Sequence, residues 1–444
     1  MVQAHGDFDI VVIGAGGCGM VAALVAAQHG ARVALLEKTD SPGGGTAFSS
    51  KGLRSAGTRF QKKLGIEDSP AQYAADIQTR NGNRSDPILT DVLARTSGEV
   101  TDWLAQCAGI DFQVPEFKFG HSARRSHTWR EDKLITEYLF EVVQRERNIQ
   151  VFFSTTLTGL AVDSNGAVTG AVTDKGTFTA GRTILATGGF GANTDLIARY
   201  IPKALGIPFP GHHASSGDGL KIALQLGADT AHMDAFQPYP AYLGPGKRSV
   251  SPEVILSGGI MVGPDGKRFV DETRYPGGLS EGILQLPDKQ AYEIFDQRVL
   301  DFQHDRVQDL EGLLVKGDTL RRVAEQLGID AAGLEQTVLA HNACERKQDA
   351  FGRNVISRLA PPFCGIKVTV ALYHTQGGIR VTADAQVLRK DGSVIPNLYA
   401  GGGVAAGVSG DGMDGYLPGN GQLASLGLGF IAGRHAAQSL ARRS

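Results

Sequence analysis

The hydrophobic pattern near the start of the chain predicts a strand, a turn and a helix. The apolar run Asp9-Ile10-Val11-Val12-Ile13 is typical of a buried strand. Glycines follow at positions 14, 16, 17 and 19, and Met20–Gln28 then has the small and apolar residues of a packed helix. A second buried strand is predicted over Arg32–Leu36. Residues 7–40 therefore have the order of a βαβ unit with a parallel sheet.

The pattern changes twice further along the chain. Residues 150–190 predict short strands that end in the apolar run Arg182–Ala186. Proline and charge become more frequent between about 230 and 365, where amphipathic helices are predicted over Asp318–Leu327 and Ala331–Cys344. Glycine-rich sequence then returns and ends in a predicted helix, Leu423–Leu440.

This alternation predicts a nucleotide-binding domain that is interrupted by an insertion. The fold class is α/β in the first domain and α+β overall. We expect a Rossmann-like domain, discontinuous in sequence, with an inserted α+β capping domain. The predicted limits are 1–228 and 367–444 for the two parts of the nucleotide domain and 229–366 for the capping domain.

The glycines after the first strand have the spacing of a dinucleotide fingerprint. Gly14 permits a tight turn, Gly16 lets the backbone approach a pyrophosphate, and Gly19 lets the helix pack closely on the strand. Glu37 lies 23 positions after Gly14, near the spacing expected of the acid that holds a ribose. NAD and FAD share these signals.

Three further segments favour FAD. Ser41–Thr46 is a second glycine loop close behind Glu37, and Thr183–Gly189 and Asn397–Gly403 are strands that end in small residues. The expected cofactor-binding residues are Gly14, Gly16, Gly17, Cys18, Gly19, Glu37, Lys38, Gly43, Gly44, Gly45, Thr46, Leu157, Ala186, Thr187, Gly188, Asp218, Gly402, Gly403, Asn420, Gln422 and Leu423.

Composition excludes several other classes of protein. The 444 residues include 59 glycines, and 44 basic against 46 acidic side chains give a net charge of -2. This balance argues against a nucleic-acid partner. The four cysteines have no zinc or haem spacing, and we expect no metal site and a reduced, cytoplasmic protein. No stretch is apolar enough to predict a membrane span.

Taken together, these motifs resemble the fumarate reductase and succinate dehydrogenase flavoprotein superfamily, which includes urocanate reductases, tricarballylate dehydrogenase and 3-ketosteroid dehydrogenases. The resemblance covers nearly the whole chain. The matching segments are Gly14–Gly19, Gly43–Thr46, Ser69-Pro70, Ala186–Phe190, Gly217–Gly219, Gly266–Glu272, His374–Gly378 and Leu417–Gly421.

The resemblance implies hydride transfer between flavin N5 and a carbon next to an electron-withdrawing group, beneath a mobile capping domain. Respiratory members attach FAD through a histidine just after the Gly-Gly loop. Residues 43–52 contain no histidine, so we expect non-covalent FAD.

The resemblance also implies the catalytic candidates. His374 matches a substrate-binding histidine of fumarate reductases, which would donate a hydrogen bond to a substrate oxygen. Arg274 and Tyr275 follow the Arg-Phe-Val-Asp-Glu motif, where fumarate reductases place a proton-donating arginine and ketosteroid dehydrogenases a catalytic tyrosine. Either residue could face the flavin.

Two departures from fumarate reductases favour another substrate. Tyr239 stands where they carry a histidine, and Tyr416 stands where they carry the arginine that binds a substrate carboxylate. A phenol cannot form the bidentate, charged contact of a guanidinium, but it can donate one hydrogen bond to a ketone oxygen. The sequence therefore favours a ketone-bearing substrate, or one with fewer carboxylates than fumarate.

Several alternatives remain open at this stage. A di- or tricarboxylate enzyme is the second interpretation, and a non-catalytic FAD-binding electron-transfer subunit is the third. Arg124, Arg125 and His127 form a basic cluster that is either a solvated loop or an attractor of a substrate carboxylate. Neither the direction of the reaction nor the external electron partner (oxygen, a quinone or a redox protein) follows from the sequence.

Overall fold

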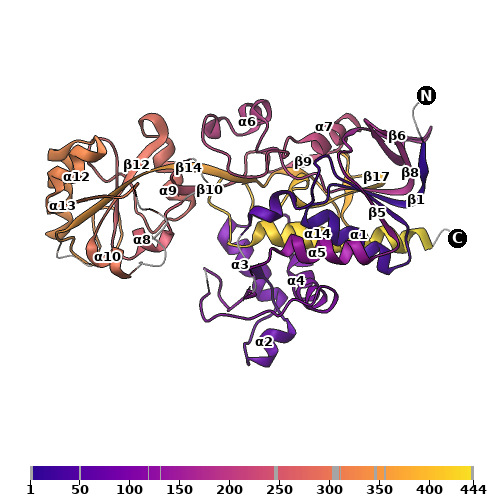
Figure 1. The fold of residues 1–444 in the computed structure, drawn as a ribbon, viewed down its shortest axis with the longest axis horizontal. Coiled ribbons are helices and arrows are strands. Elements are labelled where there is room, and N and C mark those ends of the chain that lie inside the picture. The colour runs from indigo at the N-terminus through magenta and orange to yellow at the C-terminus, as the bar shows by residue number, and fades with distance from the viewer. Residues whose placement is uncertain are drawn as a thin grey trace. The chain divides into compact units, whose positions relative to one another are not determined.

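The computed structural model describes residues 4–49, 52–118, 120–130, 132–244, 249–302, 310, 312–344, 348–354 and 357–441. They form two compact units, each with its own main sheet (Figure 1). The first unit comprises Met1–Pro202, Gly211–Phe236 and His374–Ser444, and the second comprises Lys203–Pro210 and Gln237–Tyr373.

The boundaries between the units lie later in the chain than the predicted 228 and 366. Strand β9 (Thr230–Ala231) pairs with β15 (Gly378–Ile379), which keeps residues 229–236 in the first unit. Residues 203–210 join the second unit, where the Leu372 amide donates to the Pro208 carbonyl. The sequence pattern missed both features because they depend on pairing between distant segments.

The first unit is built on a sheet with the strand order β16-β17-β8-β1-β2-β5, which β7 and β6 extend from β8. Strands β17, β8, β1, β2 and β5 run parallel, so their carboxyl ends meet at one edge, where ligands bind in such sheets. The strands of this sheet are β1 (Ala4–Ile13), β2 (Val33–Leu36), β5 (Ile149–Phe152), β6 (Leu157–Val162), β7 (Val168–Thr173), β8 (Gly176–Leu185), β16 (Gln386–Leu388) and β17 (Val394–Ala400). Strands β3 (Leu53–Arg54) and β4 (Ser126–His127) pair with each other in a separate small sheet.

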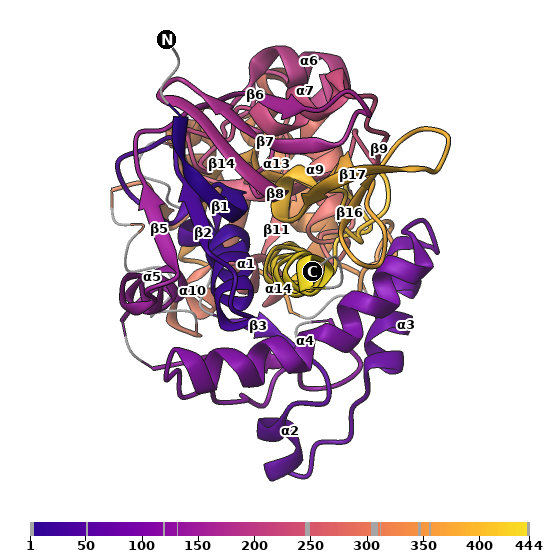
Figure 2. The same cartoon turned by 90° about the vertical axis from the view of Figure 1, so that its right-hand side faces the viewer.

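Helices α1 and α14 lie side by side against this sheet (Figure 2). A Cβ atom at Gly429 would lie 2.4 Å from the Cys18 carbonyl oxygen, and one at Gly433 would lie 2.3 Å from that of Ala22. The glycines of the last helix therefore permit close packing. The helices of this unit are α1 (Gly17–Gln28), α2 (Arg59–Lys63), α3 (Pro70–Asn81), α4 (Pro87–Cys107), α5 (Ile135–Arg145), α6 (Thr194–Tyr200), α7 (Asp218–Gln225) and α14 (Asn420–Ala441), with short 3-10 turns at Gly44–Phe48 and Gly402–Val404.

Both functional helices begin three residues earlier than predicted. Helix α1 starts at Gly17 rather than Met20, and α14 starts at Asn420 rather than Leu423. Glycine is a poor helix former, so propensity placed the glycines outside the helices. The close contacts that these glycines make with surrounding backbone and side chains override that preference.

The second unit is a sheet with the order β10-β14-β12-β11, and β13 also pairs with β14. Helices α12 and α13 lie where two amphipathic helices were predicted, and they begin after the capping residues Thr319 and Asp330. The elements are β10 (Phe236–Tyr242), α8 (Pro252–Leu256), β11 (Ile260–Val262), α9 (Gly277–Leu284), β12 (Gln290–Asp296), α10 (Gln297–Phe302), β13 (Val315–Gly317), α12 (Leu320–Leu327), α13 (Ala331–Asn342) and β14 (Phe363–Thr375), with 3-10 turns at Pro202–Ala204 and Pro287–Lys289.

In the part of the chain that the structure describes, no helix combines the length and the apolar character needed to cross a bilayer.

Candidate active site

The turn between β1 and α1 has the backbone that its glycines were expected to allow. Gly14 has a φ of 106°, a left-handed conformation that favours glycine, and its amide donates to the Leu36 carbonyl. A Cβ atom at Gly14 would lie 2.3 Å from the Ala186 oxygen, and one at Gly19 would lie 1.7 Å from the Gly14 oxygen. Neither position has room for a side chain, so the strand and the helix approach as in a dinucleotide-binding unit.

The second glycine loop lies directly beside the first. Gly16 and Gly43 form a parallel bridge, and the Gly43 amide donates to the Ala15 carbonyl at 2.9 Å. The Gly17 amide donates to the Thr46 hydroxyl at 3.3 Å. Two loops that are separate in the sequence thus form one bare backbone surface at the start of α1.

Polar side chains fix the rim of this surface. Glu37 is buried and accepts hydrogen bonds from the Ala15 and Thr39 amides, both at 2.9 Å. Lys38 forms an ion pair with Asp218 at 2.8 Å. Burial opposes ionisation of Asp218, but hydrogen bonds from Lys38, Ser216 and Lys221 outweigh it and lower its pKa to about 2. The acid expected to hold a ribose is therefore anchored at the end of β2.

Two further loops reach the same sheet edge from β8 and β17. The Ala186 amide donates to the Ile13 carbonyl, and the Gly401 amide donates to that of Leu185. A Cβ atom at Gly403 would lie 2.8 Å from the Gly189 nitrogen, so these loops touch through backbone. Gly188 and Gly402 both have left-handed φ angles, of 73° and 69°.

Two expected cofactor residues have a more structural setting than the sequence suggested. The Cys18 side chain is buried against Gly401, and burial raises the pKa of its thiol to about 12. Only its backbone amide, in the first turn of α1, can therefore serve a ligand. Leu157 begins β6 and is buried, two residues beyond Thr155, whose amide donates to the Glu37 carbonyl.

The residues around these loops fit FAD. Helix α1 has no side-chain cap from its own N-cap residue, Gly16, and such an end binds phosphate through its amides. A Cβ atom at Gly45 would meet nothing within 4 Å. Among the described residues, the buried Thr187 hydroxyl and Asn420 amide oxygen have no hydrogen-bond partner. Buried polar atoms normally have partners, so these two indicate a polar ligand.

The turn before α14 brings together Tyr416 and His374, the two catalytic candidates that lie in the first unit. Their rings meet edge to face with centroids 5.8 Å apart. The Tyr416 oxygen accepts a hydrogen bond from the Gly419 amide at 3.3 Å, and burial raises the pKa of the phenol. Tyr416 therefore stays protonated at neutral pH and keeps its O–H proton for an external acceptor.

His374 is not suited to the donor role that the sequence predicted for it. A Cβ atom at Gly421 would lie 2.9 Å from its Nε2 atom, so the ring lies on the first turn of α14. Nδ1 lies 3.3 Å from the Thr375 carbonyl, which can only accept, so Nδ1 carries the proton. Burial lowers the pKa of His374, and the neutral ring then offers Nε2 as an acceptor.

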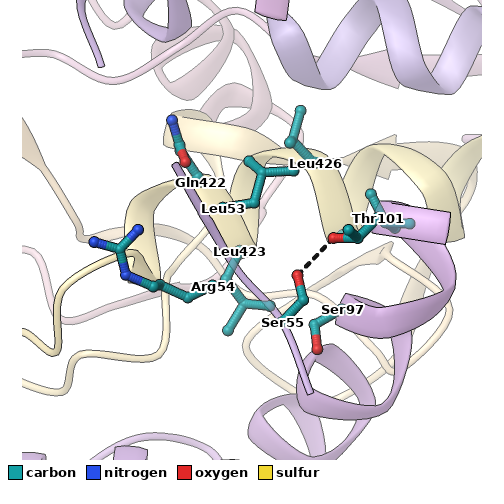
Figure 3. A pocket seen from close by; sticks show the side chains of 10 residues that line it. Leu53, Arg54, Ser55, Ser97, Thr101, Gln422, Leu423 and Leu426 are labelled. Carbon is teal, nitrogen blue, oxygen red and sulfur yellow. Dashed lines mark hydrogen bonds between the residues drawn. The ribbon is translucent and has the colours of Figure 1, made fainter. Parts of the chain in front are cut away.

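Arg54, a residue that sequence analysis missed, lies at the same turn. It ends β3, and its Cγ atom would be 2.2 Å from a Cβ atom at Gly419. Arg54 and Gln422 project to the same side of a small pocket between β3, α4 and α14, away from Thr101 (Figure 3). The one signal in the sequence that could have identified Arg54 is its position as a single arginine shortly after the second glycine loop.

The basic cluster was interpreted wrongly. Arg125 is fully buried in ion pairs with Asp68, at 2.7 Å, and with Asp76. His127 is also buried, where its Nε2 atom lies 2.8 Å from the Thr58 hydroxyl, and burial lowers its pKa to about 4. Arg124 donates to the Pro115 and Val114 carbonyls. The cluster is neither a solvated loop nor a substrate attractor.

This buried network is linked to the Tyr416 turn through His121. Arg125 donates to His121 Nδ1 at 3.4 Å, so Nε2 carries the proton and donates to the Pro418 carbonyl at 2.9 Å. Burial lowers the pKa of His121 to about 4, which keeps the ring neutral. The ion pairs thereby hold the backbone two residues after Tyr416.

The second unit holds the other catalytic candidates. The ring of Tyr239 stacks on that of Tyr373, 4.9 Å away, and meets that of Tyr275 edge-on at 6.1 Å. The Tyr239 hydroxyl donates to the Val250 carbonyl at 2.8 Å. Burial raises the pKa of both Tyr239 and Tyr275. Arg274 is exposed and lies on Gly278, so Tyr275 is the member of this adjacent pair that belongs to the buried cluster.

The Gly266–Glu272 motif is structural in this unit. Glu272 is fully buried, and its carboxylate accepts from Arg268 at 2.7 Å, from Arg353 at 3.0 Å and from the Met261 amide at 2.9 Å. Because the Glu272 carboxylate pairs with both arginines, it holds the backbone in place two residues before Arg274.

Glu293 is a buried carboxyl that the sequence analysis did not single out. Strand alternation on β12 places it on the same face as Ala291 and Phe295, which belong to the core against which Tyr239 and Tyr275 pack. Its Oε2 atom is buried without a partner among the described residues. Burial raises the pKa of Glu293 to about 8.

This carboxyl predicts stability that falls as pH rises. Between its ordinary pKa of 4.5 and about 8, the unfolded chain is ionised while the folded unit keeps the proton, which costs about 1.4 kcal/mol per pH unit. Glu293→Gln should remove this pH dependence. The free energy of unfolding of the variant, relative to that of wild type, should therefore rise by about 2 kcal/mol between pH 5.5 and pH 7. Urea unfolding of both proteins at the two pH values measures this difference. The control is Glu281→Gln, because Glu281 is exposed. Parallel pH profiles would mean that Glu293 ionises in the folded unit.

Comparisons with known proteins agree with this geometry. A family model described as "FAD binding domain" matches residues 9–423. The fumarate reductase (cytochrome) of Shewanella frigidimarina is 31% identical over 98% of this chain and 78% of its own. The NADH:fumarate oxidoreductase of Klebsiella pneumoniae (strain 342) is 30% identical over 97% of this chain, which spans 48% of that relative.

A solved structure resembles the chain over nearly its whole length. It is the 3-ketosteroid-Δ4-(5α)-dehydrogenase from Rhodococcus jostii RHA1, with a TM-score of 0.80 and 25% identity over 98% of both chains. These matches confirm the resemblance, the fold class and the cofactor that the motifs predicted. The chain binds FAD and belongs to the fumarate reductase and succinate dehydrogenase superfamily of FAD-dependent oxidoreductases.

Proposed function

We propose that this chain adds or removes a hydride and a proton across a C–C bond next to the carbonyl of a small, ketone-bearing substrate. The observation that carries the proposal is the Tyr416 hydroxyl, a neutral donor held by the Gly419 amide beside His374. A neutral donor suits a carbonyl oxygen that gains negative charge during the reaction. The ketone dehydrogenation named in the Rhodococcus relative belongs to the same class.

FAD, Tyr416 and His374 have different roles in the proposed reaction. FAD, when bound, supplies the hydride acceptor or donor, and its pyrophosphate would lie on the Gly14–Gly19 and Gly43–Thr46 loops. Tyr416 donates to the carbonyl oxygen and thereby acidifies the neighbouring C–H bond. The neutral Nε2 atom of His374 can accept a hydrogen bond or a proton there.

A second candidate, reduction of a dicarboxylate, is favoured by the 31% identity to a fumarate reductase. Tyr416 argues against it, because a phenol lacks the two charged donors that a second carboxylate needs. The proposal includes an external electron partner, which is oxygen, a quinone or a redox protein. It also includes the cytoplasmic location that is expected from the free cysteines.

The test is the response of the flavin to substrate under anaerobic conditions. Reduced holoprotein should be reoxidised by α,β-unsaturated ketones faster than by fumarate, and saturated ketones should bleach the oxidised form if dehydrogenation is favoured. Reoxidation by fumarate alone would support the second candidate. No response to ketones, oxo acids, dicarboxylates or tricarballylate would leave a non-catalytic electron-transfer subunit.

We predict that the flavin is released by acid. The described residues after the second glycine loop, 44–49 and 52, include no histidine that could carry it covalently. Precipitation with trichloroacetic acid should therefore leave a yellow supernatant with the mass of FAD and a colourless pellet. A yellow pellet from which washing extracts no FAD would contradict non-covalent binding.

A further inference from the structure

Three side chains from distant parts of the chain meet on the turn Tyr416–Gly421. The first is Tyr416 itself, and the second is His374, whose ring lies on Gly421. The third is Arg54, whose aliphatic stem lies on Gly419. Gly419 has a φ of 100°, and a side chain at this position would collide with Arg54. The two glycines thus admit a cation and an imidazole beside the phenol.

Arg54 is a permanent cation in a setting that favours an anionic ligand. Burial lowers the pKa of Arg54, and the neighbouring phenols of Tyr73 and Tyr416 offset only part of this effect. A guanidinium nevertheless stays charged at any physiological pH. Its Nη1 atom donates to the Gly52 carbonyl at 3.1 Å, which fixes one edge of the group. A guanidinium has five N–H donors and can hold more than one acceptor at once.

We propose that Arg54 binds a carboxylate of the substrate, so that the preferred substrates are small oxo acids with the ketone at Tyr416 and the carboxylate at Arg54. This inference rests on the proposed function. It moves carboxylate recognition from the position that Tyr416 occupies to Arg54 on β3, which contacts Gly419. Arg125, a member of the basic cluster that could have attracted a carboxylate, is already occupied by Asp68 and Asp76.

The test compares probes that differ only in the carboxylate. For binding, levulinate and 2-pentanone are titrated into oxidised holoprotein and followed by the flavin difference spectrum and by calorimetry. For turnover, an unsaturated oxo acid (4-oxopent-2-enoate), the matching ketone (3-penten-2-one) and crotonate are offered to the reduced protein. The variants are Arg54→Gln and Arg54→Lys, and the control is Arg95→Gln, which removes an exposed arginine of α4 that is paired with Asp91.

Wild type should bind levulinate more tightly than 2-pentanone and should prefer the unsaturated oxo acid to both other substrates. Arg54→Gln should weaken levulinate binding, and raise the Michaelis constant for the unsaturated oxo acid, about 10- to 100-fold, as expected for loss of a hydrogen bond to a charged group. Its turnover of the matching ketone should stay within about twofold of wild type, and its flavin reduction potential should not change. Arg54→Lys should restore part of the affinity, and Arg95→Gln should change nothing.

Other outcomes would overturn the inference. Equal losses with ketone and oxo acid, or a shifted flavin potential, would mean that Arg54 serves the flavin or the fold. The same affinity of wild type for levulinate and 2-pentanone would remove the carboxylate site while leaving the proposed reaction intact. Arg54-dependent levulinate binding without any turnover would keep the carboxylate site and refute the proposed function instead.

Discussion

Tyr416→Phe should lower turnover of a ketone substrate about 10²- to 10³-fold, the usual effect of removing one donor from a developing oxyanion. The ring remains to pack against His374, and the Gly419 amide loses only a 3.3 Å contact. We therefore expect FAD content and the unfolding midpoint to stay near wild type. Stopped-flow reoxidation of the reduced flavin by an unsaturated ketone isolates the affected step.

The matched control is Tyr399→Phe, the same chemical change in the first unit. The Tyr399 hydroxyl lies 3.0 Å from His435 Nδ1 and supports β17 against α14, so its loss should affect stability and leave the rate of flavin reoxidation unchanged. A Tyr416→Phe protein with a wild-type rate would remove Tyr416 from the mechanism. Equal rate losses in both variants would assign the effect to packing.

The loops of the FAD site could be predicted from the sequence because their requirements are local. Gly14 and Gly19 have roles that follow from a tight turn and a close helix within a single βαβ unit. Within this unit, a few neighbouring positions determine the turn and the start of the helix.

The substrate-facing residues could be predicted only in part, because they depend on contacts between distant segments. Arg54 contacts Gly419, which lies far later in the chain. The two-residue strand that contains Arg54 has no sequence pattern from which this contact could be predicted. His374 was found by its motif, but its protonation depends on burial and on the Thr375 carbonyl. A motif identifies a residue type at a position, and the fold determines which proton it holds.

The basic cluster shows the same limit for charge patterns. Arg124, Arg125 and His127 look like an exposed positive patch when only their neighbours in sequence are considered. The carboxylates that neutralise Arg125 come from Asp68 and Asp76, 57 and 49 positions away. Folding therefore converts an apparent substrate attractor into an internal support.

Arg125→Met should be one of the most damaging single substitutions outside the FAD loops. It leaves Asp68 as a fully buried carboxylate without its guanidinium, and breaking a buried pair in this way costs about 3–5 kcal/mol. It also removes the donor to His121 Nδ1, so the Pro418 carbonyl loses its oriented partner. We expect a lower urea midpoint, and a loss of turnover under conditions where the variant remains folded.

Arg124→Met is the natural control, because the two arginines are adjacent but have different partners. Arg124 donates two charge-assisted hydrogen bonds to carbonyl oxygens, and its removal leaves no buried carboxylate without a partner. Its loss should therefore cost about 1.5–3 kcal/mol, less than the loss of Arg125. Replacing Arg125, Asp68 and Asp76 together by apolar residues of similar size should recover stability, because no buried charge is then left alone. Turnover should recover less than stability, because His121 still lacks the guanidinium that sets its tautomer. Equal effects of Arg124→Met and Arg125→Met would contradict the assignment of the ion pairs as the support of the Tyr416 turn.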